Sequence, residues 1–248
     1  MIPFPAKEPL FLVRYPLVDE MSVTNGMTNL QATDRKNILI VEDHPLFRAM
    51  LVQLINAEIG MTVCCEVDNI DDAMLHIENE LPDAAIIDLT LQGMNGFELI
   101  KKLKARDYTF PMLVISMHDE RLYAERALLA GAKGYVSKQE TSAEVIKAIR
   151  KVLDGQIYVS ERVSGMLLER MTDSGKHVQL SGMDSLSDRE LHVFQLIGEG
   201  MNSRQISEHL KLGVSTVDSY RARIKEKLGI KNAVELYQRA AQWLLQLR

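Results

Sequence analysis

The chain has 248 residues, of which 46% are apolar and 25% are charged, and its formal net charge is -5. This is an ordinary globular composition, and the length predicts one or two domains with a sizeable core. No apolar run approaches the roughly 20 residues of a membrane-spanning helix. The two cysteines, Cys64 and Cys65, are adjacent and make no disulfide framework, so we expect a soluble cytoplasmic protein.

Residues 1–35 show no sustained hydrophobic period, and we expect a poorly ordered tail in which Met21 or Met27 is a candidate for the true start. From residue 36, short apolar runs alternate with amphipathic segments. The runs that read as strands are NILIV, MTVCCEV, AAIID, MLVIS and KGYVS. This βα unit repeated five times predicts a parallel, doubly wound α/β domain over 36–155.

After residue 155 the rhythm changes. We expect a connecting helix at SERVSGMLLERM and a polar linker, together covering 156–184. From 185 to 248 every periodic segment is helical, which predicts a second, all-α domain. This part of the chain is mildly basic, and basic residues outnumber acidic ones between Lys211 and Lys231.

Polar residues follow four of the five predicted strands. They are Glu42, Asp43, Asp88, Ser116 and Lys138. In a doubly wound sheet these positions meet beyond the carboxyl ends of the strands. Clustered carboxylates favour a hard divalent cation such as Mg²⁺, which leaves room for a phosphoryl group. We therefore expect Asp88 to act as a nucleophile that forms an acyl phosphate, with Lys138 and the Ser116 hydroxyl stabilising the phosphoryl oxygens. Helix caps and ordinary loop residues are the simpler explanation of any one of these positions.

Four motifs, ILIVEDHPLFR, IIDLTLQGMNG, LVISMHDE and GAKGYVSKQ, carry a resemblance to a known family. In order and spacing they resemble the flavodoxin-like receiver domain of two-component response regulators. The resemblance implies that Glu42 and Asp43 are the acidic metal pair, that Asp88 is the phosphoacceptor and that Thr90 is a metal ligand through its backbone carbonyl. It also implies that Ser116 is the switch hydroxyl, Tyr135 the switch aromatic and Lys138 the lysine of the site.

Two further positions bear on this resemblance. His118 and Thr90 occupy positions that tune the lifetime of the acyl phosphate in the family. Family members commonly have proline where this chain has Gln92, and its absence is expected to loosen the loop after Asp88.

The C-terminal segment contains two helix N-cap signatures, Ser187 with Glu190 and Asn202 with Gln205. Helices with inward apolar stripes follow them, joined by short turns, which predicts a helix-turn-helix. The outward face of VSTVDSYRARIKEKLG is expected to contact DNA. Its candidate residues are Ser215, Thr216, Asp218, Ser219, Tyr220, Arg221, Arg223, Lys225 and Lys227.

The stretch from LSDREL to KLGI resembles the LuxR-type DNA-binding domain of the NarL/FixJ group. Family members often place lysine where this chain has Asp218 and histidine where it has Tyr220. Asp218 is expected to be a surface residue or an intrahelical partner of Arg221, with cytosine readout as the alternative. Tyr220 fits either groove contact or packing, and Trp243 is expected in the core or at an interface.

Together the two resemblances imply a transcriptional response regulator rather than an enzyme. A sensor histidine kinase or a small phosphodonor would phosphorylate Asp88, and phosphorylation would control dimerisation and promoter binding. Two alternatives stay open. One is a phosphorylation-independent DNA-binding protein whose receiver serves as a dimerisation module. The other is a Mg²⁺-dependent aspartyl-phosphate phosphatase, although Thr90 stands where such enzymes carry a second acid.

Overall fold

The structure, a computed structural model, describes residues 35–91, 94–172 and 182–246. The expectations for the tail, for Gln92 and for most of the linker fall outside these described residues. Among them, no helix is long and apolar enough to cross a membrane.

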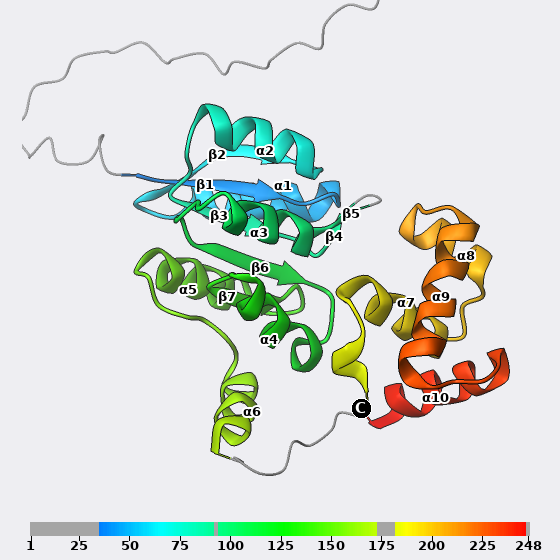
Figure 1. The fold of residues 1–248 in the computed structure, drawn as a ribbon. Helices are drawn as coiled ribbons and strands as arrows, with labels where there is room; N and C mark the ends of the chain where they lie inside the picture. The colour runs from blue at the N-terminus through cyan, green and yellow to red at the C-terminus, as the bar shows by residue number, and fades with distance from the viewer. Residues whose placement is uncertain (1–34, 92–93, 173–181, 247–248) are drawn as a thin grey trace, which may run out of the picture. The chain divides into compact units, whose positions relative to one another are not determined.

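A five-stranded parallel sheet forms the centre of the first domain (Figure 1). In spatial order its strands are β2 (Met61–Val67), β1 (Lys36–Val41), β3 (Ala84–Ile87), β6 (Met112–Ser116) and β7 (Gly134–Ser137). The helices that alternate with them are α1 (Pro45–Asn56), α2 (Ile70–Asn79), α3 (Gly96–Ala105), α4 (Glu120–Ala130) and α5 (Ser142–Leu153). The predicted doubly wound βα order is confirmed.

Apolar side chains cover both faces of this sheet because successive strand residues point to opposite sides. In β1, Ile38 and Ile40 pack in one core cluster with residues of α1 and α5. Leu39 and Val41 pack in the other with residues of α2, α3 and α4. This double burial explains why the strands read as continuous apolar runs.

A short antiparallel pair that the sequence analysis did not predict follows Asp88. It consists of β4 (Thr90–Leu91) and β5 (Met94–Asn95), and Thr90 pairs with Asn95. Gly96 closes the pair. A Cβ atom at residue 96 would lie 2.0 Å from the carbonyl oxygen of Asp88, so only glycine lets α3 start this close to that residue.

The second domain is helical. Its elements are η1 (Met183–Ser185), α7 (Asp188–Gly198), α8 (Ser203–Leu210), α9 (Val214–Leu228) and α10 (Ala233–Gln246). Both predicted capping boxes are present, at the starts of α7 and α8. Val217 and Ile224 of α9 are fully buried, and Trp243 packs on Phe194 with 5.4 Å between ring centroids. Trp243 is therefore a core residue. Between the two domains, α6 (Glu161–Thr172) forms where a connecting helix was expected.

Candidate functional site

Four parallel strands end at the same edge of the sheet and bring distant polar residues together. Glu42 and Asp43 follow β1, Asp88 follows β3, Ser116 ends β6, and Lys138 follows β7. We call these five residues the strand-end cluster. The arrangement arises because parallel strands in register place their carboxyl ends side by side, as the sequence analysis expected.

The three carboxylates of this cluster form a compact group of oxygen ligands. One carboxylate oxygen from each of Glu42, Asp43 and Asp88 lies within 4.8 Å of the others. Glu42 is 1% exposed and Asp88 is 3% exposed. Burial, together with the charge of Asp88, raises the pKa of Glu42, and burial likewise raises the pKa of Asp88. The group therefore needs compensating positive charge.

Lys138 supplies part of that charge from inside the protein. Its Nζ lies 2.7 Å from Glu42 Oε2 and 2.9 Å from Asp88 Oδ2. The ring of Phe47 faces the same ammonium, with 4.7 Å between Nζ and the ring centroid. Although burial works against the charged amine, the Asp88 and Glu42 carboxylates raise the pKa of Lys138, so it stays protonated. Nothing in the sequence pattern had pointed to Phe47.

The second oxygen of Asp88 differs from the first. Oδ1 is buried and accepts no hydrogen bond from any described residue, whereas Oδ2 is held by Lys138. A buried, unpaired carboxylate oxygen is costly unless a ligand uses it. The carboxylate set fits a hard divalent cation, because such ions take oxygen ligands from carboxylates.

His118 connects Ser116 of the strand-end cluster to Thr90 and Tyr135, which lie beside it. Its Nε2 lies 3.1 Å from Thr90 Oγ1, and its backbone N–H donates to Ser116 Oγ over 3.3 Å. The hydroxyl of Tyr135 donates to the carbonyl oxygen of His118 over 2.7 Å. Burial, together with the charge of Lys138, lowers the pKa of His118 to about 4, so the ring is neutral near pH 7. Tyr135 is 1% exposed, so its ring is already inside the domain.

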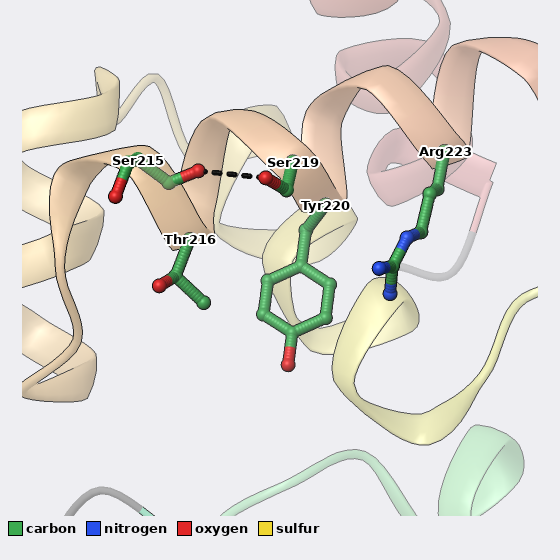
Figure 2. Close-up of a pocket in the computed structure, with 5 residues that line it drawn as sticks. All are labelled: Ser215, Thr216, Ser219, Tyr220 and Arg223. Atoms are coloured by element: carbon green, nitrogen blue, oxygen red, sulfur yellow. Dashed lines mark hydrogen bonds between the residues drawn. The ribbon is translucent and has the colours of Figure 1, made fainter.

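A polar face of α9 forms the second candidate site. Five side chains line an open hollow of about 270 Å³ on it, and we call them the outer face of α9. They are Ser215, Thr216, Ser219, Tyr220 and Arg223. Figure 2 shows them along one side of the helix, where Ser219 Oγ donates to the carbonyl oxygen of Ser215 over 2.8 Å. Spacings of one, four, five and eight residues place them on one helix face.

Asp218 and Arg221, which were also expected to contact DNA, contact other parts of the domain. Asp218 is exposed, as expected of a surface residue, and it accepts a hydrogen bond from Ser203 Oγ over 2.7 Å. This bond links α9 to the start of α8 and takes the place of the alternative pairing with Arg221. The guanidinium of Arg221 lies over the ring of Tyr237, with Cζ 5.0 Å from the ring centroid. Lys225, another residue expected to contact DNA, is half-buried.

Lys227 is turned toward α7. Its Nζ lies 2.6 Å from Oε2 of Glu190, whose side chain is 4% exposed. The same carboxylate oxygen accepts the backbone N–H of Ser187 at the start of α7. Sequence periodicity placed Lys227 on the outward face of the helix. It could not predict the ion pair with Glu190, because a long side chain at a boundary position can reach either way.

Comparisons with known proteins give a family for each of the two domains. Residues 38–150 match the family described as "Response regulator receiver domain", and residues 184–240 match "Bacterial regulatory proteins, luxR family". Response regulator UvrY of Escherichia coli K12 is 32% identical over 200 residues, covering 81% of this chain and 91% of UvrY. The putative virulence regulator BvgA of Bordetella pertussis is 34% identical over 200 residues, covering 80% of this chain and 93% of BvgA.

Solved structures add support for the fold. A LuxR-family response regulator from Aurantimonas is 31% identical with a TM-score of 0.52, covering 55% of this chain and 98% of that one. RcsB from Salmonella enterica serovar Typhimurium, bound to promoter rprA with the phosphomimetic BeF3-, has a TM-score of 0.55 at 21% identity. That likeness covers 84% of this chain and 98% of RcsB.

Proposed function

The chain belongs to the response regulators, with a receiver domain followed by a LuxR-type helix-turn-helix domain, and on that premise we propose that phosphorylation of Asp88 controls its binding to promoter DNA. Membership in this family of regulators agrees with the prediction that the chain is not an enzyme. The observation that carries the proposal is the buried, unpaired Oδ1 of Asp88 inside the strand-end cluster.

Asp88 is the proposed phosphoacceptor, and a sensor histidine kinase or a small phosphodonor is the proposed source. Oδ1 would attack phosphorus in line, forming the Oδ1–P bond while the bond from phosphorus to the donor's nitrogen or oxygen breaks. Lys138 holds Oδ2, which orients the carboxylate and offsets negative charge. The hydroxyl of Ser116 would then donate to a phosphoryl oxygen.

We propose Mg²⁺ as the metal for this reaction. The side chains of Glu42, Asp43 and Asp88 and the backbone carbonyl of Thr90 would hold it, consistent with the ion's preference for oxygen ligands. When bound, the ion would supply positive charge beside the phosphoryl oxygens. Lys138 alone cannot balance three carboxylates, which supports a requirement for this second cation.

The proposed switch starts at Ser116. Its hydroxyl now accepts the N–H of His118, whose carbonyl accepts from Tyr135. Movement of Ser116 Oγ toward a phosphoryl group would break its bond to His118 and release the loop that Tyr135 holds. Because Tyr135 is already buried, the step that we expect on phosphorylation is this change of hydrogen bonds.

The outer face of α9 is the proposed DNA-reading surface. Ser215, Thr216 and Ser219 lie toward the N-terminal end of the helix, where small polar side chains can reach base edges in the major groove. From this face Arg223 would contact phosphates. Tyr220 lies between these two groups. Lys225, the other basic residue proposed to contact phosphates, lies two positions further on and therefore on a different side of the helix. We propose that Asp218, Arg221 and Lys227 support the helix through their contacts inside the domain.

Several properties extend this proposal to the whole chain. We propose a receiver over 36–155, a connecting helix and linker over 156–184, and the DNA-binding domain over 185–248, preceded by a tail over 1–35. A homodimer formed on phosphorylation would pair two helix-turn-helix units on adjacent half-sites, which raises affinity and specificity. The proposed location is the cytoplasm, where a sensor kinase could reach the receiver.

Incubation with acetyl phosphate and Mg²⁺ tests the central step. Intact mass should show one added phosphoryl group on the wild-type protein and on Asp71→Asn, a control in an exposed acidic residue of α2, but none on Asp88→Asn. DNA selected from a random library should bind the phosphorylated protein about tenfold more tightly or better at fixed salt. An adduct that persists in Asp88→Asn, or equal affinity with and without phosphate, would overturn the proposal.

A further inference from the structure

A segment that follows α5 extends the receiver sheet at its exposed edge. β7 is the last strand in the sheet order, and residues 156–159, which we call the edge segment, run alongside it. The N–H of Tyr135 donates to the carbonyl oxygen of Tyr158 over 2.9 Å, and the N–H of Tyr158 donates to the carbonyl oxygen of Lys133 over 2.9 Å. The edge segment is therefore hydrogen-bonded to the backbone of Tyr135, the proposed switch aromatic.

Gly134 is shaped for this contact. A Cβ atom at residue 134 would lie 2.8 Å from the carbonyl oxygen of Tyr158 and 2.8 Å from Cδ1 of Leu113. No side chain fits between β7 and the edge segment unless one of them moves. The backbones of β7 and the edge segment are therefore packed as tightly as those of neighbouring strands.

The side chain of Tyr158 fixes the edge segment from the other side. Its hydroxyl donates to the carboxylate of Glu144 on α5, and Lys151 Nζ lies 5.8 Å from its ring centroid. The ring packs against the core cluster beneath α1 and α5. Burial and the Glu144 carboxylate raise the pKa of Tyr158, so it remains a hydrogen-bond donor. Main chain and side chain thus hold this residue independently.

The contacts run without a break from the strand-end cluster to α6. Ser116 Oγ is bonded to His118, whose carbonyl is bonded to Tyr135, whose N–H is bonded to Tyr158. Two residues later, Ser160 immediately precedes α6 and is bonded to its first turn. Its hydroxyl accepts the N–H of Val163 and its carbonyl accepts the N–H of Ser164. Helix α6 packs on α4 and precedes the DNA-binding domain in the sequence.

We propose that Tyr158 is a positioning residue that couples the switch aromatic Tyr135 to α6, and through α6 to the DNA-binding domain. The inference rests on the proposed function, because it assigns a route to the same phosphorylation switch. A shift of β7 at Tyr135 must either carry the edge segment with it or break two backbone hydrogen bonds. The simpler alternative is that the edge segment only covers an exposed strand edge.

The phosphorylation-dependent gain in DNA affinity separates these two roles. Tyr158→Ala removes the anchor on α5, whereas Ile157→Ala alters a neighbour that is 59% exposed and serves as the matched control. Both should accept a phosphoryl group at Asp88 like the wild type. We expect the ratio of affinities with and without acetyl phosphate to fall about fivefold or more in Tyr158→Ala and to be retained in Ile157→Ala. A purely structural role would weaken both affinities alike and leave the ratio unchanged, which would overturn the inference.

Tyr158→Phe covers the case in which the alanine variant fails to fold, since it keeps the ring and removes only the hydroxyl that binds Glu144. We expect it to lower the same ratio by a smaller factor, about twofold. A wild-type ratio in Tyr158→Phe, beside an alanine variant that does not melt cooperatively, would also count against the coupling.

Hydrogen exchange provides a readout that does not involve DNA. Beryllofluoride with Mg²⁺ should change amide exchange in wild-type peptides that contain Tyr135 and in peptides spanning 156–172. In Tyr158→Ala the change should remain at Tyr135 and disappear from 156–172. If the wild type responds in DNA binding but its 156–172 peptides do not change, the coupling is wrong and the proposed function stands. If phosphorylation leaves wild-type DNA affinity unchanged, the proposed function fails and the coupling fails with it.

Discussion

The strand-end cluster and the outer face of α9 are built on opposite principles. The cluster takes residues from four strand ends that are far apart in sequence, and within it Lys138 pairs with the buried carboxylates of Glu42 and Asp88. The outer face of α9 comes from one helix and stays open, with Ser215, Thr216, Ser219 and Arg223 exposed. Substitutions in the cluster should therefore affect folding and chemistry together, whereas those on α9 should affect binding alone.

The largest expected effect is at Lys138. Lys138→Met leaves the buried carboxylates of Glu42 and Asp88 without their ammonium partner, and we expect the free energy of unfolding to fall by about 4 kcal/mol. Urea denaturation with EDTA present measures this loss. The control is Lys36→Met, which removes an exposed ion pair to Asp83 and should leave the midpoint nearly unchanged. Equal midpoints for the two variants would contradict the claim that the buried ion pairs of the strand-end cluster stabilise the fold.

Gly96 tests the restraint on the loop after Asp88. In Gly96→Ala the new methyl would meet the Asp88 carbonyl oxygen at 2.0 Å, and we expect a loss of about 3 kcal/mol together with slower phosphorylation. Gly165→Ala in α6 is the matched control, because nothing lies within 4 Å of its Cβ position. It should stabilise the protein by about 1 kcal/mol in the same denaturation experiment. A Gly96→Ala protein as stable as the wild type would show that α3 can retreat from Asp88 at no cost.

Two arginines of α9 sharpen the comparison on the DNA side. Arg223→Ala should weaken DNA binding about tenfold for every sequence and make the salt dependence shallower by about one counterion. Arg221→Ala, whose guanidinium lies on Tyr237, should leave the salt dependence unchanged. Affinities measured over a range of salt concentrations distinguish the two, and a shallower slope in Arg221→Ala instead would reverse the assignment. Neither variant should alter the urea midpoint of the receiver.

The smallest expected effect is at the Ser203–Asp218 hydrogen bond. Ser203→Ala and Asp218→Ala should each cost about 0.5 kcal/mol in DNA-binding free energy, and the double variant should cost no more than either alone. Neither should change the preferred DNA sequence found by selection from a random library. A changed base preference in Asp218→Ala alone would show that Asp218 reads a base.

Much of the first domain could be predicted because its signals are local or follow from strand direction. The five apolar runs, the amphipathic segments between them and the polar residues at the ends of four strands were enough to predict the sheet and the meeting of Glu42, Asp43, Asp88, Ser116 and Lys138. The capping boxes of α7 and α8 were equally readable, since each involves residues three apart.

Other contacts could not be predicted, because they depend on which side chains meet across the fold. The bond between Thr90 and His118 joins residues 28 positions apart, and that between Lys227 and Glu190 spans 37 positions. The β4–β5 pair forms where Gly96 approaches the backbone of Asp88. No period in the sequence marks such meetings.

The sequence by itself determined the alternation of strands and helices, the chemical groups at the strand ends and the helix face that carries Ser215, Thr216 and Ser219. These follow from periods of two and 3.6 residues and from the direction of parallel strands. Only the tertiary structure decided that one oxygen of Asp88 has no hydrogen-bond partner among the described residues, that Lys227 pairs with Glu190 and that Tyr158 bonds to β7. Each of those outcomes is a choice among partners that are distant in sequence, and close packing allows only one of them.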